Sequence, residues 1–341
     1  METTTIRPLV ALAMGDPNGI SPELTAQLAS DPEVQAAARL LVIGDRRILD
    51  MGAADAGVTL NLPAVSRDEL DKVDGPALLD LGNMDVAAVE RGKATSAGGG
   101  FAMGNFVAAL EMARIGAVEA VTFTPFNKQA MRMVRAGYDD EVGVISEVLQ
   151  SPEHGREFNI LGGLWNARVT SHIPLREVAG RLSVDAIANA GLLASRCMQG
   201  AGMKAPRIAV AALNPHAGDG GNFGMEDMEI IAPAVDRLKK EGVLATGPVP
   251  ADTVFVRARK GEFDAVLTMF HDQGQIAMKL LGFDQGVTFL GGYAVPICTP
   301  AHGTAYDIAG RGIADIKAAR NAVLLAANMA LVNARNTADR V

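Results

Sequence analysis

The sequence has few cysteines and few aromatic residues. Among 341 residues there are only two cysteines, Cys197 and Cys298, which lie far apart and outside any Cys-x-x-Cys pattern. This argues against a disulfide framework and a cysteine-based zinc site, and a reducing cytoplasm is the expected setting. Aromatic residues make up 4% of the chain, which suits a nucleic-acid stacking surface poorly.

Positive charge and long apolar runs are also scarce. The formal net charge of -8 argues against binding to a nucleic-acid backbone as the main task, although a few local cations could still hold a small anionic substrate. No stretch reaches the apolar length of a membrane span. Residues 1–7 lack the basic and then apolar layout of a signal peptide, which again favours the cytoplasm.

What the chain does contain is a regular alternation of short apolar runs and longer helical patterns. Apolar residues make up 49% and charged residues 21%, as in a packed globular protein of one large unit or two domains. The predicted strands are residues 8–14, 40–44, 117–123, 167–170, 207–213, 265–270 and 287–290. Helices are predicted from Ser21, where Pro22 takes the first helical position, and over residues 184–198, 228–240 and 313–333. The alternation predicts an α/β fold with a mostly parallel sheet and helices on its faces.

Glycine signals are less informative in the first third of the chain. Residues 96–100 read Ser-Ala-Gly-Gly-Gly and are expected to form a loop or a hinge. No Gly-x-Gly-x-x-Gly follows the first predicted strand, so the usual dinucleotide-binding fingerprint is absent.

Three histidines follow predicted strands directly. His172, His216 and His271 each lie in a Gly-, Pro- or Asp-rich turn after an apolar run, in a chain with five histidines. Ligands of open α/β sheets bind outside the carboxyl ends of the strands, so three imidazoles placed there can converge on one divalent metal. Three protein ligands and an open position are typical of a catalytic site, because water or substrate takes the vacant place.

The alternative is that these histidines are ordinary loop residues. A histidine after a strand is usually a surface or hydrogen-bonded residue, and the spacing of the three matches no compact metal motif. Their repetition at three strand ends favours the metal site. Asp252 and Asp272 could then orient the imidazoles, although loop carboxylates are common without such a role.

Two glycine-rich segments suggest anion or cofactor binding. Residues 214–224, beginning with Asn214, could present backbone N–H groups to an anion, although turns of this composition are common. Residues 301–312 contain glycines such as Gly303, which allow close approach of a cofactor, and Asp307, which could accept hydrogen bonds from ribose hydroxyls; Thr304 lies between them and is also a candidate for cofactor binding. A carboxylate there would repel a 2′-phosphate and so favours NAD over NADP. The same segment could instead be only a loop that leads into the last helix.

Several motifs together resemble the 4-hydroxythreonine-4-phosphate dehydrogenase family. The motifs occur in the family's order and are residues 15–23 (Gly-Asp-Pro-Asn-Gly-Ile-Ser-Pro-Glu), 214–218, 250–253, 271–274 and 302–305. The resemblance covers about residues 8–335, and residues 302–312 also look like the NAD-binding loop of isopropylmalate dehydrogenases.

The resemblance implies a two-domain α/β/α fold of the isocitrate and isopropylmalate dehydrogenase type. Residues 1–125 with 300–341 would form the NAD-side domain, and residues 126–299 the metal, substrate and dimerisation domain. The protein would be a homodimer whose active site lies in the interdomain cleft, with metal ligands His172, His216 and His271 drawn from both subunits. Asp252 and Asp272 match two family aspartates of the active site, and Lys279 matches a lysine that contacts substrate.

The sequence departs from the family where the substrate's phosphate is held. The family's His-Thr pair is replaced in the segment that begins at Tyr138, and a family asparagine and arginine fall on Thr288 and Ile297. An aliphatic side chain cannot replace a guanidinium as a phosphate ligand. The terephthalate dihydrodiol dehydrogenases, whose substrate is a carboxylate without phosphate, have a similar loss.

The expected reaction is the oxidation of a β-hydroxy carboxylic acid by NAD, followed by decarboxylation. A metal would lower the pKa of the hydroxyl and fix the substrate, and a histidine-rich site suits Zn²⁺, Co²⁺ or Ni²⁺ better than Mg²⁺ or Mn²⁺. Asp272 and Lys128 are both candidates for the general base. Two alternatives stay open: a dehydrogenase of a non-phosphorylated cyclic dihydrodiol carboxylate, and a metal-binding relative without catalytic activity.

Overall fold

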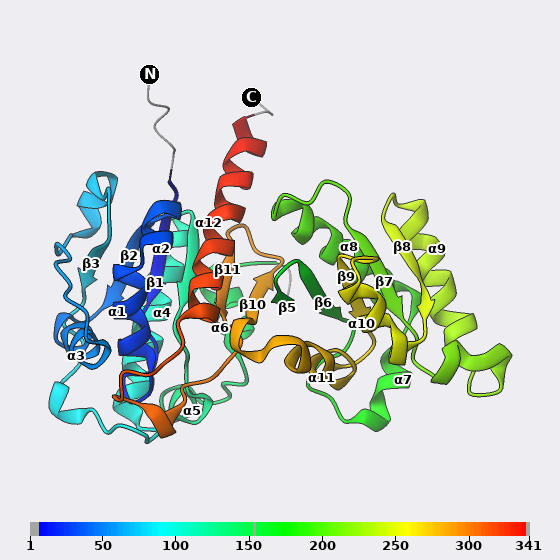
Figure 1. Cartoon of the computed structure of the whole chain (residues 1–341), viewed down its shortest axis with the longest axis horizontal. Coiled ribbons are helices and arrows are strands. Elements are labelled where there is room, and N and C mark those ends of the chain that lie inside the picture. Colours follow the sequence, from blue (N-terminus) through cyan, green and yellow to red (C-terminus); the bar gives the residue numbers. More distant parts are fainter. Residues whose placement is uncertain (1–6, 153–154, 339–341) are drawn as a thin grey trace. The chain divides into compact units, whose positions relative to one another are not determined.

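The chain forms two compact units. The computed structural model describes residues 7–152 and 155–338. Unit 1 comprises Met1–Arg156 and Val287–Val341, and unit 2 comprises Glu157–Gly286. In Figure 1 unit 1 carries the blue, cyan and red elements, and unit 2 the green and yellow ones. The units divide at 156/157 and 286/287, whereas the sequence suggested 125/126 and 299/300.

Unit 1 is built on six strands in the order β3-β2-β1-β4-β11-β10. Their bounds are β1 Leu9–Ala13, β2 Arg39–Gly44, β3 Ala77–Asp80, β4 Ala120–Phe123, β10 Val287–Gly291 and β11 Ile297–Pro300. Neighbours are parallel except β10, which runs antiparallel to β11. The loops after β1, β2, β3, β4 and β11 therefore leave the same edge.

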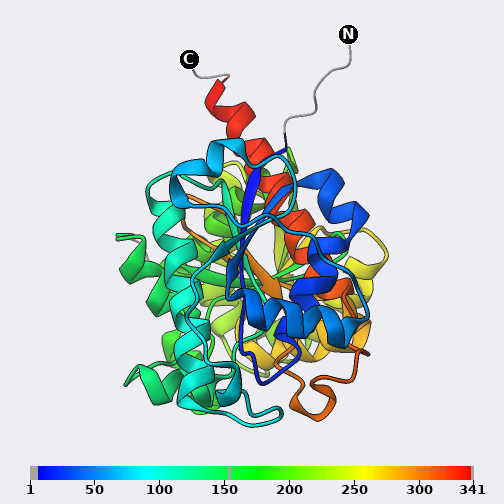
Figure 2. The ribbon, with the colours of Figure 1, turned by 90° about the vertical axis from the view of Figure 1, so that its left-hand side faces the viewer.

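Helices cover both faces of this sheet. They are α1 Ser21–Ser30, α2 Pro32–Ala37, α3 Arg46–Ala56, α4 Ser96–Arg114, α5 Lys128–Val134, α6 Glu141–Val148 and α12 Lys317–Ala338. Alternate residues of β1 point to opposite faces, because side chains alternate along a strand. Leu9 and Ala11 pack in the cluster of α4, α5 and α6, whereas Leu12 packs in the cluster of α1, α3 and α12. Figure 2 shows α4 on one side of the strands and α1 with α12 on the other.

The predicted hinge at residues 96–100 is wrong. These residues form the first turn of α4, and Thr95 caps it by accepting a hydrogen bond from Gly98 N. A Cβ on Gly99 would lie 2.1 Å from the carbonyl oxygen of Ala130 in α5. Gly99 is required because α4 and α5 approach closely there, not because the chain bends.

Unit 2 has five strands in the order β5-β6-β9-β7-β8. Their bounds are β5 Arg156–Leu161, β6 Leu164–Arg168, β7 Arg207–Ala211, β8 Leu244–Val249 and β9 Ala265–Thr268. All neighbours are parallel except β5, which is antiparallel to β6. Both units therefore confirm the predicted α/β class with mostly parallel strands.

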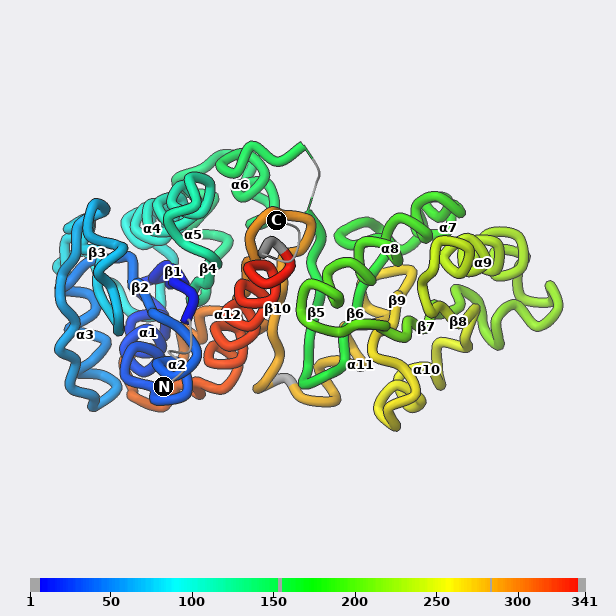
Figure 3. Tube along the Cα trace, turned by 90° about the horizontal axis from the view of Figure 1, so that it is seen from above, coloured from blue at the N-terminus to red at the C-terminus, as the bar shows by residue number. Residues whose placement is uncertain are grey.

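Unit 2 is also layered. Its helices are α7 Val178–Arg181, α8 Val184–Gly200, α9 Ala232–Lys240, α10 Ala251–Arg259 and α11 His271–Gly282. Figure 3 shows α8 and α9 on one side of the strands and α10 and α11 on the other. On the latter side Phe255 and Met278 pack with Ala209 and Val266 in one apolar cluster.

Several predicted ends differ from the observed ones. Helix α1 begins at Ser21 with Ile20 at the capping position, because the Ser21 hydroxyl donates to the carbonyl of Pro125 instead of capping. The last helix begins at Lys317 rather than at 313, and α9 is preceded by a π-helical turn, Asp227–Ile231. Among the described residues, no helix is both long and apolar enough to cross a membrane.

Candidate functional site

The three predicted metal ligands come from three neighbouring strands of unit 2. Strands β6, β9 and β7 are adjacent and parallel, and the loops with His172, His271 and His216 follow them in that order. The histidine loops therefore leave the same edge of one sheet, as the sequence predicts. Bound ligands of open α/β sheets commonly lie at such an edge.

His172 and His271 lie side by side. Their ring centroids are 5.6 Å apart. A zinc–nitrogen bond of roughly 2.1 Å places the centres of two imidazoles on one tetrahedral ion roughly 5 Å apart, so the pair fits a shared metal. His271 Nδ1 is 2.7 Å from Asp272 Oδ1, which fixes the ring and leaves Nε2 for a ligand. Asp272 thus has the orienting position that the sequence suggests.

His216 lies on an exposed turn of unusual backbone geometry. His216, Ala217 and Asp219 have φ values of 52°, 56° and 46°, and Gly218 and Gly220 also have positive φ. A left-handed backbone costs energy for any residue with a Cβ, and such strain concentrates at functional sites. The ring of Phe223 lies 6.0 Å from the His216 ring.

Two polar side chains tie the histidine loops together. Thr170 Oγ1 donates to the carbonyl of Met269 (2.7 Å), which joins the His172 loop to the His271 loop. Gln273 Oε1 accepts from Met269 N (2.7 Å), and its Nε2 donates to the carbonyl of Ala212 (2.6 Å). Because Ala212 begins the loop that leads to His216, Gln273 links this loop to the start of α11.

A buried carboxylate holds the start of the loop that carries His216. Asp227, which is fully buried, accepts hydrogen bonds from Leu213 N (2.8 Å) and Asn214 N (3.0 Å). Asn214 Nδ2 donates to Glu226 Oε2 (2.8 Å), so this amide already has a partner within unit 2. A role for Asn214 in cofactor binding stays a prediction.

The third histidine does not join the other two within one chain. Over residues 7–152 and 155–338, no three His, Cys, Asp or Glu side chains form a group that could hold a metal ion. One chain therefore supplies the pair His172 and His271, and His216 is presented separately on its own turn.

Three further predicted site residues, all charged, are exposed. Lys279 lies on α11, Asp252 lies in the first turn of α10, and Lys128 is the first residue of α5 in unit 1. Exposure leaves each of them accessible to a substrate. Their roles in binding and in proton transfer stay predictions.

The two altered pocket positions lie on paired strands of unit 1. Thr288 on β10 is half-buried and faces Thr299, whereas Ile297 on β11 is fully buried in the core shared with α4. The segment that replaces the His-Thr pair is packed as well. Tyr138 is buried, its hydroxyl donates to Glu141 Oε1 (2.8 Å), and burial raises its pKa well above the usual range.

The arginines near this segment are also occupied. Arg135 pairs with Glu147 (2.5 Å), and Arg132 Nε donates to the carbonyl of Tyr138 (3.0 Å). A phosphate that used either guanidinium would have to compete with these contacts.

The predicted cofactor segment follows β11 in unit 1. Gly303 is exposed, Thr304 is buried, and Ala305 has a φ of 42° before the short 3₁₀ turn Tyr306–Ile308. Asp307 is the middle residue of this turn, and its carboxylate is exposed. The segment therefore presents the carboxylate to solvent, as ribose recognition requires.

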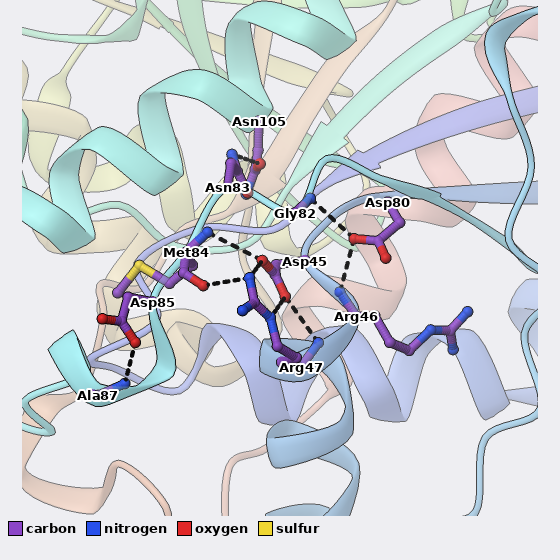
Figure 4. Close-up of polar contacts among 10 residues, drawn as sticks. All are labelled: Asp45, Arg46, Arg47, Asp80, Gly82, Asn83, Met84, Asp85, Ala87 and Asn105. Atoms are coloured by element: carbon purple, nitrogen blue, oxygen red, sulfur yellow. Dashed lines mark hydrogen bonds and ion pairs between the residues drawn. The ribbon is translucent and has the colours of Figure 1, made fainter.

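The neighbouring loops of the same edge are held by an Asp–Arg pair. Figure 4 shows Asp45, just after β2, accepting from Arg47 and from Met84 N. The hydrogen bond from Arg47 is the main reason that the pKa of Asp45 lies below its usual value, although burial opposes it. Asn105 of α4 donates to the carbonyl of Met14 and accepts from Asn83, so β1 and the β3 loop are fixed together.

The residues that support the histidine loops carry almost no recognisable signal in the sequence. Thr170, Gln273 and Asp227 act through backbone groups, and no spacing in the sequence marks such contacts. The only available signal for Gln273 was its place in the motif that begins at His271.

Comparisons with known proteins identify the family of the chain. Residues 36–326 match the family described as pyridoxal phosphate biosynthetic protein PdxA. A Rhizobium meliloti (strain 1021) protein with the provisional name 4-hydroxythreonine-4-phosphate dehydrogenase 2 is 59% identical over 327 residues, 95% of this chain and 94% of the relative.

Solved structures extend the similarity to the fold. The crystal structure of 4-hydroxythreonine-4-phosphate dehydrogenase from Klebsiella pneumoniae has 30% identity and a TM-score of 0.83, covering 96% of this chain and 99% of its own. Terephthalate 1,2-cis-dihydrodiol dehydrogenase from Burkholderia xenovorans LB400 has 29% identity and a TM-score of 0.63, with 94% and 98% covered.

Proposed function

The chain belongs to the PdxA family of dehydrogenases, and from that premise we propose that it is a metal- and NAD-dependent dehydrogenase of a β-hydroxy carboxylic acid. Membership confirms the resemblance stated from the motifs. The observation that carries the proposal is the pair His172 and His271, 5.6 Å apart at the strand ends, with Asp272 on the far nitrogen of His271.

We propose that His172 and His271 of one chain and His216 of a second copy hold one divalent ion. The separate, strained presentation of His216 supports a ligand shared between the subunits of a homodimer. A bound Zn²⁺, or Co²⁺, Ni²⁺, Mn²⁺ or Mg²⁺, supplies Lewis acidity that lowers the pKa of a substrate hydroxyl.

The other residues bind, orient or move a proton in this proposal. Asp307 accepts from the ribose hydroxyls of NAD, next to Gly303 and Thr304. Lys279 contacts the substrate's anionic group, and Asp272 or Lys128 takes the hydroxyl proton. The carbinol hydrogen leaves as hydride to NAD⁺. When the resulting β-keto acid loses CO₂, the electron pair of the broken C–C bond passes toward the ketone oxygen to give an enolate, which then takes up a proton at carbon.

A second candidate substrate class is favoured by the altered pocket. Ile297 lies in the core and Tyr138 bonds to Glu141, so neither offers a donor to a phosphate. We therefore propose that a carboxylate without phosphate, such as a cyclic dihydrodiol carboxylate, is the better substrate and 4-hydroxythreonine-4-phosphate the poorer one. Each lost charge-assisted hydrogen bond would weaken phosphate binding by about 1.5–3 kcal/mol.

The experiment is a substrate panel combined with metal analysis. NADH formation is measured with phosphorylated and non-phosphorylated hydroxy acids, each with Zn²⁺, Mn²⁺ or Mg²⁺. Turnover of 4-hydroxythreonine-4-phosphate with a micromolar KM would contradict the second candidate. A metal-loaded protein that forms no NADH with any substrate would support a catalytically silent relative instead.

Mixed dimers test the sharing of ligands. His216→Ala and His271→Ala proteins should each lose metal and activity as pure dimers. If the site is shared, a mixture should recover about a quarter of wild-type activity, because half of the dimers are mixed and each has one intact site of two. No recovery in a mixture proven to contain mixed dimers would mean that one chain supplies all three ligands.

A further inference from the structure

Residues 15–23 contribute no ligand, base or cofactor contact to the proposed reaction, yet several of them contact the cofactor segment directly. Asp16 Oδ2 accepts from the Tyr306 hydroxyl at 2.5 Å. Ile20 N donates to the carbonyl of Thr304 at 3.0 Å. A Cβ on Gly19 would lie 2.5 Å from that same carbonyl oxygen, so only glycine allows the approach.

Helix α1, which follows residues 15–20, also contacts the chain just beyond the cofactor segment (residues 301–312). Glu23 Oε1, on α1, accepts from Ala314 N at 2.7 Å. Between the two ends, Arg91 pairs with Asp55 at 2.8 Å and donates to the carbonyl of Gly310 at 3.3 Å. The cofactor segment is therefore hydrogen-bonded to neighbouring parts of unit 1 near its start, along its length and just beyond its end.

The loop that carries Asp16 is itself fixed. Asp16 N donates to the carbonyl of Pro125 (3.0 Å) and Gly15 N donates to Thr124 Oγ1 (2.8 Å). Asn18 Nδ2 donates to Thr95 Oγ1 (2.9 Å) at the start of α4. These hydrogen bonds hold the loop of residues 15–18 in one position. The contact between Asp16 and Tyr306 therefore fixes the start of the turn Tyr306–Ile308.

The Asp16–Tyr306 contact is the shortest of these hydrogen bonds, at 2.5 Å. Asp16 is 1% exposed, and its other side-chain partner is Asn18 N (2.9 Å). Burial raises the pKa of Asp16, while the hydrogen bond from Tyr306 opposes that rise. Removing a hydrogen-bond donor from a buried carboxylate costs more free energy than removing one from an exposed carboxylate, because water does not replace the lost bond.

We propose that Asp16 and Tyr306 are positioning residues that hold the turn Tyr306–Ile308, and with it Asp307, ready for the ribose of the nicotinamide cofactor. This inference rests on the proposed NAD dependence. Tyr306 is the first residue of the turn and Asp307 the next, so movement of the ring displaces the ribose acceptor. The pair therefore acts on cofactor affinity and not on the chemical step.

The test compares Tyr306→Phe with Asp16→Asn and with a matched control. Tyr293→Phe is the control, because the Tyr293 hydroxyl is also part-buried in unit 1 and bonds to Ser146 (3.0 Å) and the carbonyl of Val142 (3.2 Å), away from the cofactor segment. Tyr306→Phe should raise the Kd and KM for NAD about tenfold and leave kcat at saturating NAD within about twofold. Asp16→Asn, whose amide oxygen can still accept, should give a smaller rise, and Tyr293→Phe should give none.

Hydrogen exchange without cofactor supplies the second readout. Amides of residues 303–312 should exchange faster in Tyr306→Phe than in the wild type or in Tyr293→Phe. An NAD affinity within twofold of wild type together with unchanged exchange overturns the inference, as does an equal loss in the control. If the wild type itself binds no NAD, the proposed function fails. The exchange data still show whether the Asp16–Tyr306 hydrogen bond holds the turn Tyr306–Ile308.

Discussion

Replacing Gln273 by Glu tests whether one side chain joins the histidine loops of unit 2. The change keeps the oxygen that accepts from Met269 N and replaces the donor to the carbonyl of Ala212, 2.6 Å away, by a second acceptor. An acidic residue is favourable in the first turn of a helix, so α11 itself should form. The substitution thus breaks one tie and spares the other.

The expected loss follows from the burial of Ala212. This residue is fully buried, and a carbonyl that loses its donor there costs about 1–3 kcal/mol of unfolding free energy. The new carboxyl faces a carbonyl and is stabilised in its protonated form, so its pKa should rise above the usual value of about 4.3. The deficit should therefore be small below pH 4 and grow to its full size as pH rises through the raised pKa.

Urea unfolding at pH 7 and at pH 4 measures both statements, and hydrogen exchange of residues 212–218 reports the loop itself. Metal titration should show weaker binding at pH 7. The matched control is Gln275→Glu, which makes the same charge change in α11 but loses a bond to Asn159 rather than to Ala212. Wild-type stability and wild-type loop exchange in Gln273→Glu at pH 7 would refute the reasoning.

Three further predictions concern unit 1. Gly99→Ala should lower the unfolding free energy by about 1–3 kcal/mol, because its Cβ would meet the carbonyl of Ala130 at 2.1 Å, whereas Gly100→Ala should stabilise by about 0.5–1 kcal/mol in the same helix. Thermal unfolding separates the two, and equal effects would contradict the packing argument. Asp45→Asn should cost about 1–2 kcal/mol at pH 7. Since Arg47 lowers the pKa of this carboxyl in the folded state, the cost should begin to shrink as pH falls below about 4, the unfolded-state value, and should be lost only as pH falls through the lowered pKa, which denaturant titrations at several pH values would follow. Asp307→Ala should reduce the preference for NAD over NADP roughly tenfold in kcat/KM, and an unchanged ratio would show that Asp307 does not face the adenosine ribose.

Strands were predicted most reliably from the sequence where the apolar run was clear and was followed by a turn. The strands before His172, His216 and His271 were predicted because each combines a short apolar run with a turn. Strand β8 was missed because it contains Gly247 and Pro248 at the edge of the sheet, where such residues are tolerated. Strand β3 has only four residues and gave too short a pattern.

The positions of the histidine loops were predictable from the sequence, but the contacts that support these loops were not, and the role of the histidines as metal ligands stays a prediction. Histidines after strands can be read from the sequence, whereas the tie from Gln273 to Ala212 depends on which strands become neighbours. The glycines at 98–100 were misread because glycine signals both flexibility and close packing, and for Gly99 only the position of Ala130 decides between the two. The left-handed turn at His216 also has no sequence mark beyond its glycines.

Unit 1 is formed by two stretches of the chain with unit 2 between them, and this affects how it folds during synthesis on the ribosome. Strand β4 ends at Phe123, but its neighbour β11 begins only at Ile297, and one apolar face of the sheet is covered by α12. Unit 2 is contiguous and can fold as soon as Gly286 has emerged. During that interval the nascent chain exposes the side of β4 that awaits β11, together with apolar residues such as Leu24 that await α12. The period of greatest aggregation risk therefore begins when β4 has been synthesised and lasts until β11 and α12 have emerged.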